Sequence, residues 1–417
     1  MDKKIFNILF VLYPVTNIYG IGIQGLSVGK ILLLLCGLYS ITKNHLSFSF
    51  PKRYLLFAIW MFIVPYFYIL SSWTDIHSII YKSIGLLTFV ILIGLSCRLV
   101  TFEYAFRYFK KSTLIFTSFF CIQFIVKQAT GITLSGLIPG LPLADATSID
   151  SYLSMQSTLT RCCSVFLEPA HFAVYITLYL ALKLILLNGK VWDKDVLYIL
   201  FALIILQSGN GYLCLLALGI AYIIINLKSI LKNSGRLVML ILSIACMSCL
   251  LYLLVKNSAM LSDTFSRIAE IEADGNQNSS GFIRIFRGFY YYSDLSPIEK
   301  CLGIGQGNEI SYAQTHSMYN YLMLDTYTDT VYLNGVQQIL VYGGLIGLLL
   351  FLNFMLKYYK CRATLFLVLP FTVLIFISGM YNSSTMLMYL VFMDMVRRKY
   401  TKDNLALYKT QINYAHK

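Results

Sequence analysis

The residues of this sequence best suited to chemistry are a carboxylate, an imidazole and a phenol at helical spacing. Glu168, His171 and Tyr175 stand at i, i+3 and i+7, and Pro169 is of a type favoured at the first position of a helix. A helix capped by Glu168 would place the three side chains on one face. A helix start favours a bound anion, so His171, oriented by Glu168, is suited to act as a general base beside a phosphate. The alternative is a capping glutamate and a histidine hydrogen-bonded to a neighbouring helix, and the residues alone leave both open.

Arginines in two further segments are suited to holding that phosphate. Arg284 and Arg287 lie three residues apart in a stretch, 280–292, with the pattern of a short amphipathic helix, and they share its polar face. Guanidinium groups bind phosphate oxygens through paired N–H donors. The alternative is an interfacial helix whose arginines reach toward lipid headgroups. The apolar face of this helix is expected to hold Ile283, Phe286 and Tyr290.

His316 is a second candidate base in the same part of the chain. It follows the motif Gly303-Ile-Gly305-Gln-Gly307-Asn308, whose glycines are typical of a tight turn at the membrane surface. The glycine spacing is superficially that of a dinucleotide-binding loop, but no strand precedes it, so we exclude that interpretation. Many tyrosines surround this segment. Their rings and hydroxyls suit a sugar, although membrane interfaces are also rich in tyrosine.

Membrane helices must position these residues, because the composition excludes a soluble protein. Of the 417 residues, 58% are apolar and 12% are charged, whereas a soluble domain carries about 25% charged residues. The apolar residues form blocks of about 17–22, the length that crosses a bilayer as a helix. We expect an all-α polytopic membrane protein with about twelve transmembrane helices, near 5–22, 27–42, 54–71, 79–97, 112–129, 169–187, 194–208, 211–227, 236–255, 334–356, 363–381 and 384–396.

The predicted spans divide the chain into six regions. They are 1–126 with the first five membrane helices, 127–168 as a first large loop, 169–255 with helices six to nine, 256–333 as a second large loop, 334–396 with the last three helices, and 397–417 as a tail. Both large loops are expected to carry short helices. The candidate site residues fall in these loops or at the start of the sixth helix, so we expect the chemistry there.

The net charge of +14 reflects membrane topology and not a nucleic-acid site. Most of the 33 basic residues fall in segments on one side of the predicted membrane, and positive charge favours the cytoplasmic side. Both termini are therefore expected in the cytoplasm, and both large loops on the opposite face. The first apolar block lacks a small-residue cleavage site, so we interpret it as a retained anchor.

No motif in the chain indicates a metal or a cofactor, and we expect neither. Histidines and cysteines lack metal-ligand spacing, and no phosphate-binding P-loop is present. Cys162, Cys163 and Cys301 fall in the outward-facing segments, which permit one disulfide and require none. The chain also lacks two similar halves and a series of intramembrane carboxylates, which argues against a transporter.

Four stretches of the chain resemble the O-antigen and capsular polysaccharide polymerases, a family related to the O-antigen ligases. The most specific is Phe166-Leu-Glu168-Pro169-Ala170-His171-Phe172, with Arg161 before it. The others are Ser208-Gly209-Asn210-Gly211-Tyr212, the motif Gly303–Asn308, and the segment from Asn334 through Gly343-Gly344 to Leu352. The order of helices and loops is similar over nearly the whole chain. The sequence departs from the family at Ala170, where a serine is frequent.

The resemblance implies a polymerase that joins undecaprenyl-diphosphate-linked oligosaccharide repeats at the periplasmic face of the bacterial inner membrane, by metal-independent glycosyl transfer. The implied catalytic residues are His171, Glu168 and His316, and the implied substrate-binding residues are Arg161, Arg284, Arg287 and Tyr175. The implied partners are the lipid-linked glycans, the bilayer and a chain-length regulator, with no nucleic acid. An O-antigen ligase, which passes the glycan to lipid A core, and a flippase of lipid-linked repeats are the alternatives.

Overall fold

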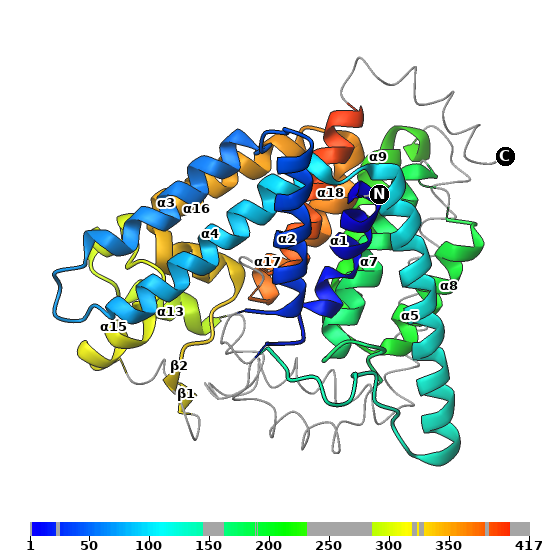
Figure 1. Cartoon of the computed structure of the whole chain (residues 1–417), viewed down its shortest axis with the longest axis horizontal. Coiled ribbons are helices and arrows are strands. Elements are labelled where there is room, and N and C mark those ends of the chain that lie inside the picture. The colour runs from blue at the N-terminus through cyan, green and yellow to red at the C-terminus, as the bar shows by residue number, and fades with distance from the viewer. Residues whose placement is uncertain are drawn as a thin grey trace.

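The computed structural model shows an all-helical chain, apart from one hairpin of two-residue strands (Figure 1). It describes residues 2–21, 26–144, 162–187, 189, 191–231, 286–318, 323–324, 329–379 and 383–400. Each span predicted from the sequence contains a helix, except the one at 236–255, which lies outside the described residues. The all-helical character predicted from the composition is thus confirmed for the described part.

The helices at the predicted spans are α1 (Asp2–Thr16), α2 (Val28–Lys43), α3 (Lys52–Phe67), α4 (Ile76–Leu99), α5 (Phe102–Thr130), α7 (Pro169–Leu186), α8 (Lys194–Leu206), α9 (Gly209–Leu231), α16 (Gly335–Tyr359), α17 (Leu365–Ile377) and α18 (Ser384–Tyr400). Shorter elements lie between them: α13 (Gly288–Ser293), α14 (Pro297–Leu302), α15 (Glu309–Thr315), β1 (Met323–Leu324), β2 (Asp329–Thr330) and η4 (Arg362–Thr364). The strands pair antiparallel, with Met323 opposite Thr330.

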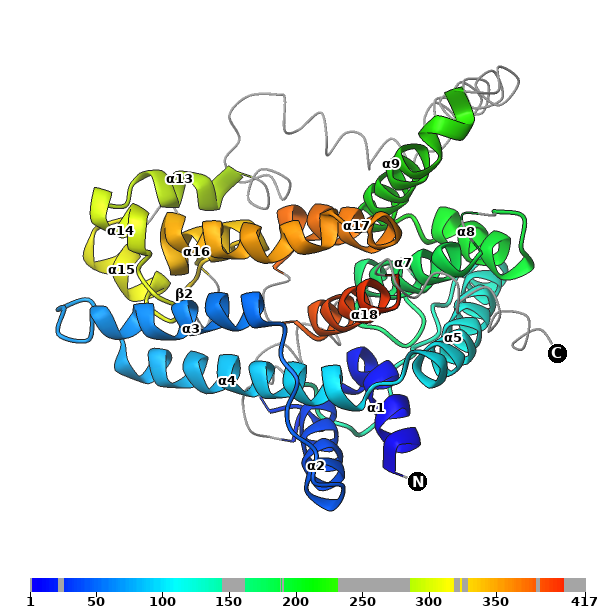
Figure 2. The ribbon, with the colours of Figure 1, turned by 90° about the horizontal axis from the view of Figure 1, so that it is seen from above.

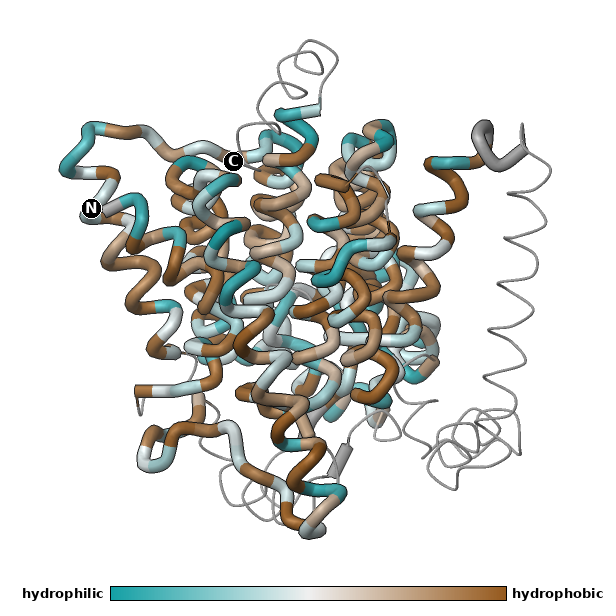
Figure 3. The backbone as a smooth tube through the Cα atoms, turned by 90° about the vertical axis from the view of Figure 1, so that its right-hand side faces the viewer, coloured by the Kyte–Doolittle hydropathy of each residue, from teal (hydrophilic) through white to brown (hydrophobic). Residues whose placement is uncertain are grey.

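Five of the described helices, α4, α5, α7, α9 and α16, are long and apolar enough to cross a membrane. Large apolar side chains repeat on their outer faces at steps of three or four residues, as Leu216, Ile220 and Ile224 do on α9 and Leu345 and Leu349 on α16. Exposed stripes of this kind are unfavourable in water and match hydrocarbon. Figure 3 shows hydrophobic residues along much of the helices' length. The chain is a helical membrane protein.

The helices form two groups that differ in tilt (Figure 1). α3, α4 and α16 lean together and carry the short helices α13–α15 at one end, whereas α1, α2, α5 and α7 stand more upright. Seen from above, α17 and α18 lie between the two groups (Figure 2). α7 is the most enclosed of the five long apolar helices, and it packs against α5, α8, α9 and α17. α7 is therefore the helix around which α5, α8, α9 and α17 pack.

α5 begins at Phe102, well before the predicted start near 112. Its first turns are amphipathic, because Ala105 and Phe109 are buried while Glu103 and Arg107 are exposed. Hydropathy alone locates only the apolar part of such a helix, since the charged turns lower the average. The helix therefore extends through residues that the sequence assigned to a loop.

α16 is kinked at Gly344, and the kink binds a neighbouring segment. Gly344 has φ +64° and ψ −165°, so the carbonyls that precede it lose their usual helical donors. The backbone N–H groups of Ile304 and Gly305 take their place, donating to the oxygens of Val341 and Tyr342 at 2.8 and 3.0 Å. A break in an apolar helix thus becomes an attachment point, because buried carbonyls require donors.

The segment that attaches there is the predicted glycine turn. Gly303, Gly305 and Gly307 all have positive φ, which side chains rarely adopt. A Cβ on Gly305 would lie 2.4 Å from the Cα of Pro65 in α3, and one on Gly307 would lie 2.9 Å from the backbone nitrogen of Ile79 in α4. The predicted tight turn is confirmed, and it ties the short helices to α3, α4 and α16.

Candidate functional site

The first part of the candidate site is the start of α7. Glu168 has an extended backbone and Pro169 takes the first helical position, so the predicted helix start is confirmed. The Glu168 side chain makes no capping hydrogen bond to the helix. His171 lies in the first turn with an exposed side chain, and within the described residues no hydrogen bond or ion pair holds its ring. The imidazole is accessible, and no described neighbour positions it.

Tyr175 is buried and does not join an exposed stripe with His171. Rings of Phe109 and Phe166 enclose it, with centroids 4.8 and 5.2 Å away. Its hydroxyl lies 2.8 Å from the Ser112 hydroxyl oxygen and also donates to a backbone oxygen of α1 at 3.2 Å. The helix gives these residues the predicted spacing, but α7 enters the bundle after its first turn, so Tyr175 lies inside the bundle while His171 is exposed.

The segment that leads into α7 is held by hydrogen bonds to α5. Ser164, in a left-handed conformation, donates its N–H to the side-chain oxygen of Gln123 at 2.7 Å, and the Gln123 amide donates back at 3.1 Å. The Ser164 hydroxyl donates to the backbone oxygen of Phe116. Burial raises the pKa of the Cys163 thiol to about 12, and Cys163 and Cys301 are both free thiols. Hydrogen bonds, not a disulfide, hold this segment.

The second part of the candidate site is the α13–α15 unit, residues 288–315. The Ser296 hydroxyl and the Glu299 carboxylate form a capping box at the start of α14. Glu299 also accepts a hydrogen bond of 2.6 Å from the Tyr312 hydroxyl in α15. The Tyr291 hydroxyl in α13 donates to the backbone oxygen of Glu309 at 2.8 Å. Burial, and then the bond to Glu299, raises the pKa of Tyr312, so its phenol stays protonated as a donor.

His316 ends α15, with its ring held on an aromatic surface. The imidazole stacks on Tyr312, with centroids 3.9 Å apart and 20° between the planes, and Trp73 lies edge-on to Tyr312 at 5.0 Å. Nδ1 of His316 is 2.9 Å from the Tyr312 backbone oxygen. A carbonyl only accepts, so Nδ1 carries the proton and Nε2 of the neutral ring carries the lone pair. Because His316 is exposed, this geometry suits a general base.

The predicted site residues lie in two separate parts of the molecule. Glu168 and His171 belong to the start of α7, whereas Arg287 and His316 flank the α13–α15 unit. α7 and α15 lie apart in both views, with α17 between them (Figures 1 and 2). The described structure therefore does not bring His171 and His316 together. The two remaining predicted arginines, Arg161 and Arg284, lie outside the described residues.

The helix predicted over 280–292 is present in its described part, and the two described residues of its predicted apolar face lie at the surface. Phe286 and Tyr290, expected on the apolar face, are 41% and 51% exposed, while Gly288 and Tyr291 are buried. A Cβ on Gly288 would lie 2.4 Å from the side-chain oxygen of a glutamine in α16. The face of α13 that packs on α16 therefore carries Gly288 and Tyr291. Arg287 precedes α13 and is half-buried.

Two residues of the α13–α15 site had no place in the sequence prediction. The role of Glu299 could have been predicted from the sequence, because Ser296-Pro-Ile-Glu299 matches the capping-box pattern at a helix start. The position of Trp73 could not have been predicted, because this residue belongs to the connection between α3 and α4, far from His316 in the sequence. Only the packing of α15 against that connection brings its ring to the site.

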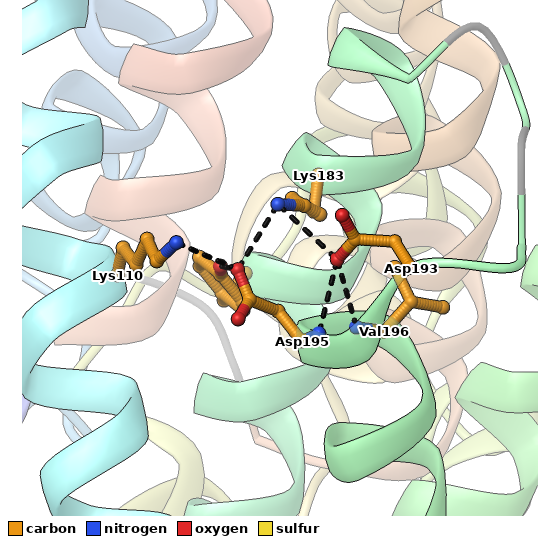
Figure 4. Close-up of polar contacts among 6 residues, drawn as sticks. Lys110, Lys183, Asp193, Asp195 and Val196 are labelled. Carbon is orange, nitrogen blue, oxygen red and sulfur yellow. Dashed lines mark hydrogen bonds and ion pairs between the residues drawn. The ribbon is translucent and has the colours of Figure 1, made fainter. Parts of the chain in front are cut away.

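The other end of α7 carries an ion network (Figure 4). The Lys183 ammonium lies 3.0 Å from Asp195 and 3.2 Å from Asp193, and Lys110 of α5 lies 2.9 Å from Asp195. Asp193 also accepts the backbone N–H groups of Asp195 and Val196, which caps α8. These pairs join α5, α7 and α8, which is a structural role. Every charged member of the network has a described partner.

Within the described ranges, no group of three or more His, Cys, Asp or Glu side chains is placed to hold a metal ion. No family model matches the chain, and no curated protein sequence is significantly similar to it.

Proposed function

We propose that this membrane protein is a glycosyltransferase that joins undecaprenyl-diphosphate-linked oligosaccharide repeats into O-antigen or capsular polysaccharide. A hydroxyl of the acceptor repeat attacks the anomeric carbon of the donor glycan. The new glycosidic bond forms as the bond from that carbon to the lipid diphosphate breaks. The hydroxyl proton passes to a base, and the departing diphosphate requires positive charge.

The observation that carries the proposal is the imidazole of His316, which is exposed and is fixed by a hydrogen bond and by stacking on Tyr312. Its Nδ1 is engaged by the Tyr312 backbone, which leaves Nε2 of this exposed residue as the nitrogen that would accept a proton. The partly buried ring of Trp73 lies beside it and is of the kind on which a sugar packs, while the buried Tyr312 ring supports the imidazole from within. Arg287, at the start of the same unit, supplies a guanidinium for the diphosphate. His171, beside Glu168, is the alternative base.

The proposal includes twelve membrane spans, cytoplasmic termini, and both parts of the site on the periplasmic side of the inner membrane. Basic side chains at one end of the bundle support this orientation, since Arg98, Lys183, Lys357 and Arg397 all lie in the last turns of their helices. The start of α7 and the α13–α15 unit adjoin the opposite helix ends. Lipid-linked donor and acceptor would then approach from the outer leaflet.

Two alternatives differ in what they require of the α13–α15 unit. An O-antigen ligase uses the same donor and passes the glycan to lipid A core, so it needs a similar base and similar arginines. A flippase moves the lipid-linked repeat without bond chemistry and needs no oriented base. The hydrogen bond and stacking that hold His316 therefore favour a transferase over a flippase.

The test is complementation of a deletion strain with wild type, His316→Ala, His171→Ala or His77→Ala, each shown to be present in the membrane. His77 is an exposed histidine at the start of α4 and serves as the matched control. We expect His316→Ala to reduce chain extension by about 10²–10⁴-fold, the usual contribution of a general base. Single repeats on core should then accumulate, while His77→Ala restores long chains.

Each other outcome points to a different function or base. Loss with His171→Ala alone would move the base to α7. Long glycan that stays on its lipid carrier above bare core would identify a ligase. Lipid-linked repeats confined to the cytoplasmic leaflet would identify a flippase and overturn the proposed chemistry.

A further inference from the structure

A basic pocket of about 400 Å³ lies where α4, α5 and α18 end or begin. Its lining includes Cys97 and Arg98 at the end of α4, Phe102 at the start of α5, and Arg398 and Lys399 near the end of α18. The end of α4, the start of α5 and the end of α18 lie at the end of the bundle away from the α13–α15 unit (Figure 1). The pocket is therefore separate from the candidate catalytic site.

The cations of this pocket outnumber the carboxylates beside it. Arg398 lies 2.5 Å from Asp394, and Lys399 lies 3.7 Å from Glu103. Arg98 is exposed, and no carboxylate within the described residues pairs with it. Three cations line the pocket and two carboxylates oppose them, so the pocket favours an anion. Arg98 is the guanidinium that a ligand can engage without breaking an ion pair.

The position of the pocket along the helices places it at the membrane surface. α4 and α5 are both long and apolar enough to span, and only Val100 and Thr101 connect them. A connection this short keeps the ends of both helices at one depth, the depth of the lipid headgroups. The Lys399 ammonium lies over the ring of Phe102 at 4.9 Å, so the pocket combines cations with an apolar wall.

We propose that this pocket binds an anionic phosphate group through Arg98, with Arg398 and Lys399 contributing charge. Two sources carry such a group at this depth: the headgroup of an acidic phospholipid, and soluble phosphate or a phosphate ester. The site does not depend on the proposed transferase function. If the pocket binds no phosphate group, the proposed transferase function is unaffected.

The experiment measures binding to the purified full-length chain in detergent micelles. The probes are dihexanoyl-phosphatidylglycerol, dihexanoyl-phosphatidylcholine and inorganic phosphate, each titrated by native mass spectrometry or thermal shift. The variants are Arg98→Gln, Arg98→Lys and Arg107→Gln, the last being an exposed arginine of α5 outside the pocket lining. Arg98 is exposed, so its substitution is expected to leave the unfolding temperature unchanged.

We expect phosphatidylglycerol to bind more tightly than phosphatidylcholine, and Arg98→Gln to weaken that binding about fivefold, as loss of one surface cation should. Arg98→Lys should retain most of the affinity, and Arg107→Gln all of it. Inorganic phosphate binding with the same Arg98 dependence would support the pocket and identify a soluble source. Equal binding of both lipids without any phosphate binding, or affinities unchanged in Arg98→Gln, would overturn the proposal.

Discussion

The two ends of this helical bundle use their carboxylates in different ways. At the basic end, Asp394 is buried and lies 2.5 Å from Arg398 and 3.4 Å from Lys357. In the α13–α15 unit, Glu299 instead accepts hydrogen bonds from the Tyr312 hydroxyl and from a backbone N–H. At the basic end, the carboxylate neutralises lysine and arginine side chains between helices. In the α13–α15 unit, the carboxylate holds short helices together.

This difference separates the part of the molecule that stabilises the bundle from the part that carries the proposed site. At the basic end, Asp394 of α18 pairs with Lys357 of α16, and Lys399 of α18 with Glu103 of α5, so ion pairs join neighbouring helices. The α13–α15 unit is attached through glycines and backbone hydrogen bonds, and its His316 is left exposed. Substitutions at the basic end should therefore act on stability, and those in the unit on its docking and on activity.

The largest effect is expected at Asp394, whose side chain is 3% exposed. Asp394→Ala leaves Lys357 and Arg398 without their common partner, and breaking a buried pair on one side typically costs about 3–5 kcal/mol. The free energy of unfolding in mixed micelles measures this loss. Asp394→Asn keeps the shape and part of the hydrogen bonding, so its loss should be smaller. An Asp394→Ala variant as stable as wild type would contradict the structural role of the basic end.

A second, more local effect is expected at Gly305. Gly305→Ala places a side chain at φ +80°, where its Cβ would lie 2.4 Å from Pro65. The left-handed conformation costs about 1–2 kcal/mol, and overpacking typically adds about 1–3 kcal/mol. Limited proteolysis should show faster cleavage within the α13–α15 unit, with the helical circular dichroism of the bundle retained.

The matched control for that substitution is Gly85→Ala in α4, where an added Cβ meets no atom within 4 Å. Alanine is the better helix former by about 1 kcal/mol, so this variant should be no less stable than wild type. Equal proteolysis of the Gly305→Ala and Gly85→Ala variants would mean that the glycine turn does not hold the unit.

The smallest effect is expected at Lys110, whose side chain is 43% exposed although it lies 2.9 Å from Asp195. Water screens such a pair, so Lys110→Ala should cost only about 0.2–1 kcal/mol. Lys183, 13% exposed and bound to the same carboxylate, should matter more. Unfolding of the two variants under identical conditions makes the comparison. If Lys110→Ala lowered the free energy of unfolding as much as Asp394→Ala, the exposure of an ion pair would not predict its contribution to stability.

Patterns within one element were predicted well, and relations between elements were not. Pro169 marked the start of α7, and the glycines of the 303–307 segment marked a turn, because both depend on local backbone geometry. The sequence did not indicate that Tyr175 is buried, because its depth depends on the helices packed around α7. Nor did it indicate which face of α13 packs on the bundle, since that depends on the close contact at Gly288.

Apolar blocks of membrane-spanning length and the scarcity of charge determined from the sequence that this protein is a bundle of apolar helices, because backbone groups in hydrocarbon must be satisfied within the chain. Residue types also located the candidate bases, His171 and His316. Only the tertiary structure decided that these histidines lie in different parts of the bundle, and that one of them rests on Tyr312 near Trp73. Such contacts join residues distant in the chain, and helix packing, which no local pattern encodes, determines them.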